Sequence, residues 1–526
     1  MCGTPCWCYR VCTEFFVKCH TVILTSIRLL SWLLAIVATV FLFWLSSTFG
    51  AFWWNPEVDR SNYWHLSDAF LHGQLSFLVE PSAELLALED PYSLGERGTM
   101  PFIWDASLYN GRYYLYFGPI PALLFYIPHK MLFGFYPDDD FAIATFSLLT
   151  SVLLFVACRL VSTRLTQVRA PSLGAFWFLY IAFATSLSLQ LGGAMYVVAA
   201  TSAMFFQVLA LISLLMVMTT TKSKAGWAAV MGVATICAIG SRPTHLVLVP
   251  VVFLALVLME LRGSGRRASM RSCMAFMTPV ALGGVALAAY NYLRFEDFTE
   301  FGLSYQLGVA DLRKYALCSI QGVWEQPKLL AVQAWYLLLQ YPTLLSEYPY
   351  LSFLRIAPEQ LPVSIEGYLG ADPVTGLFAF SPLLAPGLLA TAVYWRRLTG
   401  PTRLVFGACL LIGAIGLVYL HTCFFSAARY LFEVVSALMI VTLPMLWVAC
   451  SQARSLVGRW IWRCITVVGL VVGIAMGALG TLDGHFQKVS YTAPVLQAGE
   501  MMVRERLGLV PEPIIRYQDP SEQIIQ

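Results

Sequence analysis

Apolar runs of about twenty residues recur along most of the 526-residue chain. This is the length at which an α-helix crosses the hydrocarbon layer of a membrane. The runs are rich in Leu, Ala, Val and Gly, which favours a helix bundle over a barrel. The pattern predicts an all-α polytopic membrane protein with about 11 transmembrane helices. The predicted spans are residues 21–50, 140–160, 172–191, 195–219, 225–240, 244–261, 272–292, 376–395, 404–421, 430–450 and 463–482.

A further apolar segment, residues 114–135, does not fit this count. A full crossing here would put the aspartates at 138–140 inside and the arginines at 159–169 outside, against the charge rule for membrane loops. Gly118 and three prolines also interrupt the helical pattern. We therefore predict a re-entrant or interfacial segment. An ordinary span that violates the charge rule is the alternative.

Composition and charge support the membrane assignment and orient the chain. Hydrophobic residues make up 58% of the sequence and charged residues only 12%, about half the charged share of soluble domains. Residues 51–113 contain nine acidic and three basic residues, whereas the short connections between alternate spans are rich in arginine and lysine. The positive-inside rule places the basic connections and the amino terminus in the cytoplasm.

The predicted organisation follows from this orientation. It consists of a cytoplasmic amino terminus (1–20), a first span (21–50), a large non-cytoplasmic loop (51–139), a block of spans (140–292), a second non-cytoplasmic segment (293–375), a second block of spans (376–482) and a non-cytoplasmic tail (483–526).

Most residues capable of chemistry lie on the predicted outer side. In the first loop, a carboxylate held just outside the bilayer suits a general base, because charge interactions strengthen there as the dielectric constant falls. The candidate substrate-binding residues of this loop are Glu57, Tyr63, Asp68, Asp105 and Arg112. A solvated acidic loop with an aromatic interfacial belt is the plainer interpretation of the same pattern.

Further candidates lie at the outer ends of later spans. Arg242, followed by Pro243 and then His245, lies between two spans, where an arginine needs a partner or a lipid phosphate. Tyr305 belongs to a polar and aromatic stretch after residue 291. Arg429, Tyr430 and Glu433 enter a late span, and the two charged residues share a helix face at i, i+4 spacing. Snorkelling of Arg242 and mutual neutralisation of the late pair remain the alternatives.

Other chemistry finds no support in the sequence. There is no P-loop and no dinucleotide fingerprint, which argues against nucleotide hydrolysis. The 13 cysteines show no pair of CxxC motifs at zinc-site spacing. We expect no cofactor; a divalent cation is compatible with the acidic loop but is not supported.

Taken together, these residues resemble the GT-C superfamily of membrane glycosyltransferases, near the bacterial relatives of the protein mannosyltransferases and the aminoarabinose transferase. Asp59, Tyr63 and Gly73 match its early loop pattern, and Arg242 with Pro243 its outer span junction. The matches at the later elements are Asn291, Tyr292, Arg294, Phe295, Phe301, Gly302, Tyr305, Gln306, Arg429, Tyr430 and Glu433. The chain departs from the family in lacking an Asp-x-Asp pair and a second aspartate after the third or fourth apolar run.

The resemblance implies an inverting sugar transfer from a polyprenyl-phosphate donor on the non-cytoplasmic face. It makes Asp59 the base and Arg242 and Arg429 the residues that hold the donor phosphate. The implied partners are the lipid-linked donor and membrane lipids, not nucleic acid, and the implied location is a bacterial inner membrane. Two other functions fit the residues alone: a lipid or glycan transporter or flippase, and a non-catalytic membrane assembly protein.

Overall fold

The computed structural model describes residues 61–98, 100–166, 195–220, 223–263, 266–308, 327–346, 351–352, 375–423 and 430–487. The predicted spans 21–50 and 172–191 and the tail beyond residue 487 lie outside these residues.

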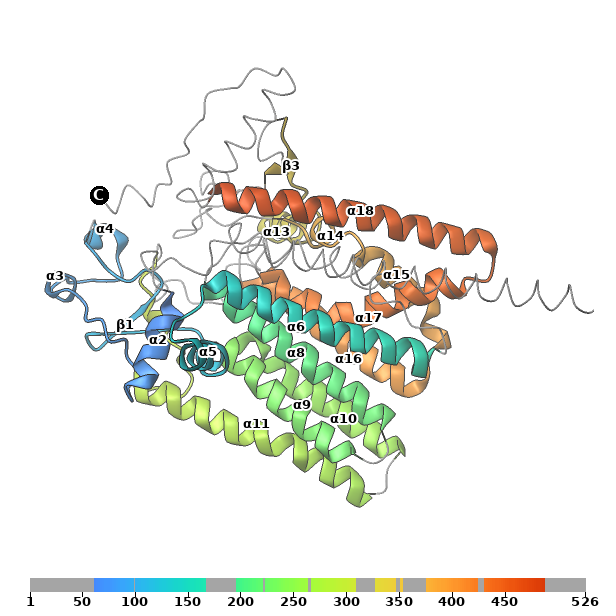
Figure 1. Cartoon of the computed structure of the whole chain (residues 1–526), viewed down its shortest axis with the longest axis horizontal. Coiled ribbons are helices and arrows are strands. Elements are labelled where there is room, and N and C mark those ends of the chain that lie inside the picture. Colours follow the sequence, from blue (N-terminus) through green and yellow to red (C-terminus); the bar gives the residue numbers. More distant parts are fainter. Residues whose placement is uncertain are drawn as a thin grey trace, which may run out of the picture.

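Within the described residues, eight helices are long and apolar enough to cross a membrane. They lie side by side in one bundle (Figure 1). They are α6 (Asp139–Leu160, extended by the π-helix η3, Val161–Leu165), α8 (Met195–Thr219), α9 (Lys224–Ser241), α10 (Leu248–Gly263, preceded by the 3-10 helix η4, Pro243–Val247), α11 (Arg266–Phe295), α16 (Gly400–Cys423), α17 (Leu431–Gln452) and α18 (Leu456–Gln487). Eight of the eleven predicted spans are thereby confirmed, and the chain is a helical multi-pass membrane protein.

The predicted span 376–395 is not one continuous helix. This stretch forms two helices, α14 (Leu377–Phe380) and α15 (Leu384–Tyr394), followed by the 3-10 turn η7 (Trp395–Arg397). Ser381 separates them with φ −126° and ψ 77°. A residue before proline is driven out of the α region, and Pro382 supplies no backbone N–H, so the helix stops here.

Helices α8 and α17 form the centre of the bundle, and α11 and α18 lie at its periphery. In the most apolar 18-residue stretch of each helix, 89% of the residues are buried in α8 and 83% in α17, against 17% in α11 and 11% in α18. A helix that is apolar on all sides belongs in an interior, as α8 does. Exposed side chains such as Leu282 and Val468 on the peripheral helices form a surface suited to lipid.

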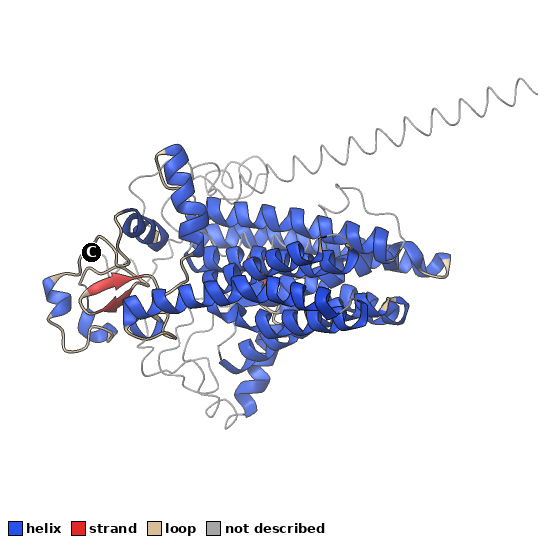
Figure 2. Cartoon of the chain, turned by 90° about the horizontal axis from the view of Figure 1, so that it is seen from below, coloured by secondary structure: helices blue, strands red, loops and turns tan. Residues whose placement is uncertain are grey.

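One end of the bundle carries a small subdomain, which we call the loop end (Figure 2). It comprises α2 (Asn62–Leu71), α3 (Ala83–Leu86), α4 (Leu94–Arg97) and an antiparallel hairpin of β1 (Ser107–Tyr109) and β2 (Arg112–Tyr114). Asn110 and Gly111 form the tight turn with φ of 48° and 70°. Asn-Gly is a dipeptide typical of tight hairpin turns, and both positive φ values match the twist of a hairpin.

The segment that follows α11 packs on this hairpin. Leu307 donates its backbone N–H to Ala106 O at 2.8 Å, and Ser107 Oγ donates to Gly302 O at 2.7 Å. The turn η5 (Leu303–Tyr305) lies between these contacts. The remaining described elements are α13 (Pro327–Leu338) and the antiparallel pair β3 (Thr343–Leu344) and β4 (Leu351–Ser352).

The segment 114–135 ends in a short apolar helix. It consists of the π-helix η2 (Ala122–Tyr126) and α5 (Ile127–Phe133), 12 residues in all. At 1.5 Å per residue this helix reaches about 18 Å, well short of the ~30 Å hydrocarbon layer. Its exposed apolar face includes Met131 and Leu132. Whether it re-enters the membrane or lies in the interface stays a prediction.

The opposite end of the bundle, which we call the basic end, collects the arginine-rich connections. Gln452 at the end of α17 donates to Thr166 O beyond η3 at 3.3 Å, which joins two of these connections directly. In the connections 158–170, 219–230, 258–272, 394–404 and 450–464 the only acidic residue is Glu260. That this end faces the cytoplasm is the orientation predicted from charge.

Candidate functional site

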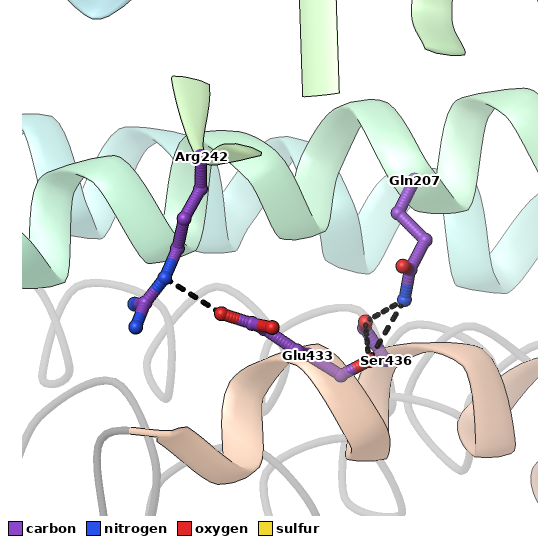
Figure 3. Close-up of polar contacts among 4 residues, drawn as sticks. All are labelled: Gln207, Arg242, Glu433 and Ser436. Carbon is purple, nitrogen blue, oxygen red and sulfur yellow. Dashed lines mark hydrogen bonds and ion pairs between the residues drawn. The ribbon is translucent and has the colours of Figure 1, made fainter. Parts of the chain in front are cut away.

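A buried ion pair joins the end of α9 to the start of α17, near the loop end of the bundle. Helix α9 ends at Ser241 because Arg242 precedes Pro243 and adopts an extended backbone with φ −149° and ψ 115°. Arg242 Nε then lies 2.6 Å from Glu433 Oε1 on the first turn of α17 (Figure 3). The two side chains are only 9% and 10% exposed.

Helix α8 holds both partners in place. Gln207 Nε2 donates to the backbone carbonyl of Glu433 at 3.0 Å and to Ser436 Oγ at 2.5 Å (Figure 3). One and a half turns earlier on α8, Ser202 Oγ lies 2.9 Å from Ser241 Oγ at the end of α9. The central helix therefore fixes the first turn of α17 and the last turn of α9 with separate polar contacts.

Two further groups surround the ion pair. The Arg242 guanidinium lies 5.4 Å from the centre of the Tyr430 ring, a cation–π distance. His245 on η4 is 98% buried, since its exposed fraction is 2%. Both Glu433 and Arg242 act electrostatically on the His245 ring. In the part of the chain that the structure describes, neither His245 nitrogen has a hydrogen-bond partner.

A tyrosine–carboxylate cluster adjoins this group from the loop side. The Tyr126 hydroxyl donates to Asp139 Oδ1 at the start of α6. The Tyr63 ring stacks on the Tyr126 ring with centroids 5.5 Å apart and planes 9° apart. Burial, reinforced by the charge of Asp139, raises the pKa of Tyr63 and of Tyr126 well above the ordinary value. Both phenols are therefore neutral hydrogen-bond donors at physiological pH.

Tyr63 connects the two groups. Its electrostatic neighbours include Asp139, Tyr290 on α11 and Arg242. The Tyr63 and Tyr290 hydroxyls are buried and lack a hydrogen-bond partner among the described residues, as does Arg242 Nη1. Residues from α2, η2, α6, the end of α9, η4, α11 and α17 thus converge on one region. We call it the polar cluster; its members are Tyr63, Tyr126, Asp139, Arg242, His245, Tyr290 and Glu433.

The unsatisfied atoms of the polar cluster indicate a binding site. A buried polar group without a partner costs about 1–3 kcal/mol, and most native groups avoid that cost. Here the donors are two tyrosine hydroxyls and a guanidinium nitrogen, and the His245 ring offers a donor and an acceptor. The carboxylates of Asp139 and Glu433 outnumber the single arginine. The cluster is therefore equipped for a hydroxyl-rich ligand, with Arg242 as its one cation among the described residues.

Four of the predicted site residues make their contacts within the loop-end subdomain instead. Asp68 accepts from the Tyr136 hydroxyl at 2.8 Å. Asp105, at φ 58°, accepts from Gln306 Nε2 at 2.5 Å. Arg112 is exposed on β2. The Tyr305 ring lies 4.7 Å from the Tyr109 ring and 5.7 Å from Phe295, between centroids.

The segment Asn291–Phe295 has a structural role, which Arg294 carries. Arg294 Nη1 donates to Leu115 O at 2.6 Å, Nη2 donates to Asn291 Oδ1 at 2.8 Å, and its guanidinium lies 3.7 Å from the centre of the Tyr290 ring. This side chain is 2% exposed. Its donors are committed to the protein, so it ties the end of α11 to the strand that leaves the hairpin.

Of the predicted substrate-binding residues, the structure places Tyr63, Arg242, His245, Tyr430 and Glu433 close together; that they bind substrate stays a prediction. The catalytic candidate Asp59 and the candidates Glu57 and Arg429 lie outside the described residues. Ser61, two residues after Asp59 in the chain, hydrogen-bonds through its side chain to Tyr126 and caps α2.

Sequence reasoning missed Asp139, Tyr126 and Tyr290. The three aspartates at 138–140 served there only as a marker of membrane orientation. The available signal was their position: an acidic residue directly at a span end is costly and is retained for a purpose. Among the described residues, no group of three His, Cys, Asp or Glu side chains gathers in a way that would hold a metal ion.

Comparison with known proteins gives distant structural likenesses. No family model and no curated protein matches the sequence. The archaeal oligosaccharyltransferase AglB from Archaeoglobus fulgidus, in complex with an inhibitory peptide and a dolichol-phosphate, is 13% identical with a TM-score of 0.46, over 85% of this chain. A second structure of an oligosaccharyltransferase from that organism, tethered with an acceptor peptide, is 14% identical with a TM-score of 0.46, over 92% of this chain.

A third similar structure is ArnT from Cupriavidus metallidurans bound to undecaprenyl phosphate. It is 15% identical with a TM-score of 0.41, covering 94% of this chain and 84% of that one. The chain spans only 56% and 60% of the two oligosaccharyltransferases. At these TM-scores no residue of this chain can be equated with a residue of those enzymes.

Proposed function

We propose that this protein is a membrane glycosyltransferase that transfers a sugar from a polyprenyl-phosphate donor to an acceptor at the loop end of the bundle. The observation that carries the proposal is the polar cluster with its unpartnered buried hydroxyl, imidazole and guanidinium groups. A sugar presents many hydroxyls that both donate and accept, and these are the partners that the cluster lacks. In the proposed orientation this end is the non-cytoplasmic face of a bacterial inner membrane.

The position of the cluster suits a lipid-linked donor. It lies where α9 breaks at Arg242 and α17 begins near Glu433, at the end of apolar helices. A polyprenyl chain would lie along the bundle while its phosphate and sugar reach the cluster. Arg242 would face the phosphate through its unpartnered Nη1, with Arg429 as the second cation. Glu433 would keep the Arg242 guanidinium oriented.

The proposed chemistry is a single displacement with inversion. Asp59 takes the proton from an acceptor hydroxyl as that oxygen forms a bond to the anomeric carbon. The bond from this carbon to the phosphate oxygen breaks, and the lipid phosphate leaves with the electron pair. A positioned base of this kind contributes on the order of 10²–10⁴ in rate. The charge that develops on the leaving phosphate is the reason for a cation beside it.

The test is release of the lipid phosphate by purified protein in nanodiscs. Wild type, Asp59→Asn and the exposed-carboxylate control Asp297→Asn receive a panel of polyprenyl-phosphate sugars and a crude membrane acceptor extract. We expect release by wild type and by the control, and at least a hundredfold less by Asp59→Asn.

Each other outcome has a definite meaning. Full release by Asp59→Asn refutes Asp59 as the base and makes Asp139, the carboxylate of the polar cluster, the next residue to replace. Absence of release by folded wild type over the whole panel contradicts the transferase proposal itself. Movement of intact donor between leaflets in that case would indicate the transport function.

A further inference from the structure

The basic end of the bundle contains a hollow that the proposed transfer does not use. It has a volume of about 500 Å³ and is lined by Val393, Tyr394, Arg396, Arg397, Ala453 and Arg454. The lining residues come from two places far apart in sequence: the end of α15 with the turn after it, and the turn between α17 and α18. Tyr394 and Ala453 are buried and the three arginines are exposed around them.

The three arginines are not neutralised by the protein. Between residues 376 and 482 the only acidic residue is Glu433. It begins α17 and pairs with Arg242, whereas Arg454 follows the other end of that helix, roughly 30 Å away along its axis. Within the described residues, neither Arg396, Arg397 nor Arg454 forms an ion pair. Three positive charges therefore converge on one hollow without a counterion.

Two neighbouring arginines hold the backbone around this hollow in place. Arg403 donates to Arg396 O at 3.0 Å and to Leu398 O at 2.9 Å. Arg459 donates to Ala453 O at 3.4 Å. These two side chains fix the backbones of the two turns. The positive-inside rule accounts for basic residues in such turns, but it does not require charges from separate turns to share one hollow with an aromatic floor.

We infer that this hollow binds the phosphate of an anionic phospholipid headgroup. A guanidinium binds phosphate through two parallel hydrogen bonds, and arginine is the residue suited to that geometry. Basic pockets between helices at the charged face of a membrane protein bind such headgroups. An exposed apolar lining residue favours a lipid over free phosphate: Val393 is 57% exposed. This inference is independent of the proposed transfer, whose site lies at the opposite end.

Binding to delipidated protein in detergent tests the inference. Dioctanoyl phosphatidylglycerol, dioctanoyl phosphatidylcholine and inorganic phosphate are titrated separately, with bound lipid counted by native mass spectrometry. The pocket variant Arg397→Gln/Arg454→Gln is compared with Arg159→Gln/Arg271→Gln, which removes the same charge from other connections at this end. Wild type and the control are expected to bind one phosphatidylglycerol, and the pocket variant to bind roughly a hundredfold more weakly, tenfold for each guanidinium.

The outcomes separate the possible sources of the phosphate. Displacement of phosphatidylglycerol by millimolar inorganic phosphate supports the phosphate chemistry. Phosphate binding without any lipid adduct overturns the lipid assignment. Equal loss of lipid in the two variants, or equal binding of the zwitterionic lipid, overturns the site. The variant Arg397→Lys/Arg454→Lys keeps the charge but loses the paired hydrogen bonds, so intermediate affinity is expected from a specific site and wild-type affinity from mere charge.

Discussion

The ion pair between Arg242 and Glu433 allows a quantitative prediction. Two unit charges 2.6 Å apart attract by about 6 kcal/mol at an effective dielectric constant of about 20. Removing both charges from water offsets much of this attraction. Arg242→Met or Glu433→Leu alone leaves one buried charge unpaired, and each is expected to cost about 3–5 kcal/mol of stability. The double variant restores neutrality and is expected to cost far less than the sum.

The assay is equilibrium unfolding in mixed detergent and SDS micelles, followed by tryptophan fluorescence, for all four proteins. A coupling energy of at least about 2 kcal/mol is expected for this pair. The Lys224–Glu260 pair provides the comparison, because its atoms are 3.9 Å apart and the lysine is 31% exposed. Its coupling should be smaller. Additive losses at Arg242 and Glu433, within about 0.5 kcal/mol, would show that the charges do not stabilise each other and would refute the reasoning.

Two further predictions concern the loop end. A Cβ built on Gly118 would overlap the carbonyl oxygen of Gly240, whereas one on Gly284 meets nothing within 4 Å. Unfolding measurements should therefore show a loss of about 1–3 kcal/mol for Gly118→Ala and no loss for Gly284→Ala; equal effects would contradict the close approach. Burial raises the pKa of Tyr63 above its ordinary 10.0, so its contribution to stability is complete below pH 10 and is lost as the pH rises above it. Thermal scans from pH 8 to 11 should show that the free energy of unfolding falls less steeply with pH for Tyr63→Phe than for wild type or the exposed-site control Tyr341→Phe. The difference in slope should reach up to about 1.4 kcal/mol per pH unit. Identical slopes would refute the raised pKa of Tyr63.

The sequence was sufficient to predict the spans because their physical cause is local. A run of about twenty apolar residues must form a helix in lipid whatever its neighbours are. The helix break within 376–395 also has a local cause. A hydropathy average over this stretch does not register Pro382, but this proline interrupts the helix at Ser381. The Asn110–Gly111 turn is local in the same sense, since its conformation depends on two adjacent residues.

The candidate site was predictable only in part, because contacts between distant elements decide it. The Arg-Pro junction marked Arg242, and the cost of an arginine in a membrane implied a partner. Only the packing of α9 and α17 against the same helix, α8, brings Glu433 to it. Asp105 and Tyr305 looked equally functional in the sequence. Their side chains prove to be occupied with joining the hairpin to the segment after α11.

The contact between Gly118 and Gly240 fixes the distance between the loop end and α9. Two backbones meet there without an intervening side chain, one leading from the hairpin and the other ending directly before Ser241 and Arg242. Side-chain contacts accommodate substitution by exchanging one rotamer for another, but this contact has no such adjustment. A residue larger than glycine at position 118 would therefore push the segment that follows the hairpin away from the end of α9, and with it the loop end from Arg242.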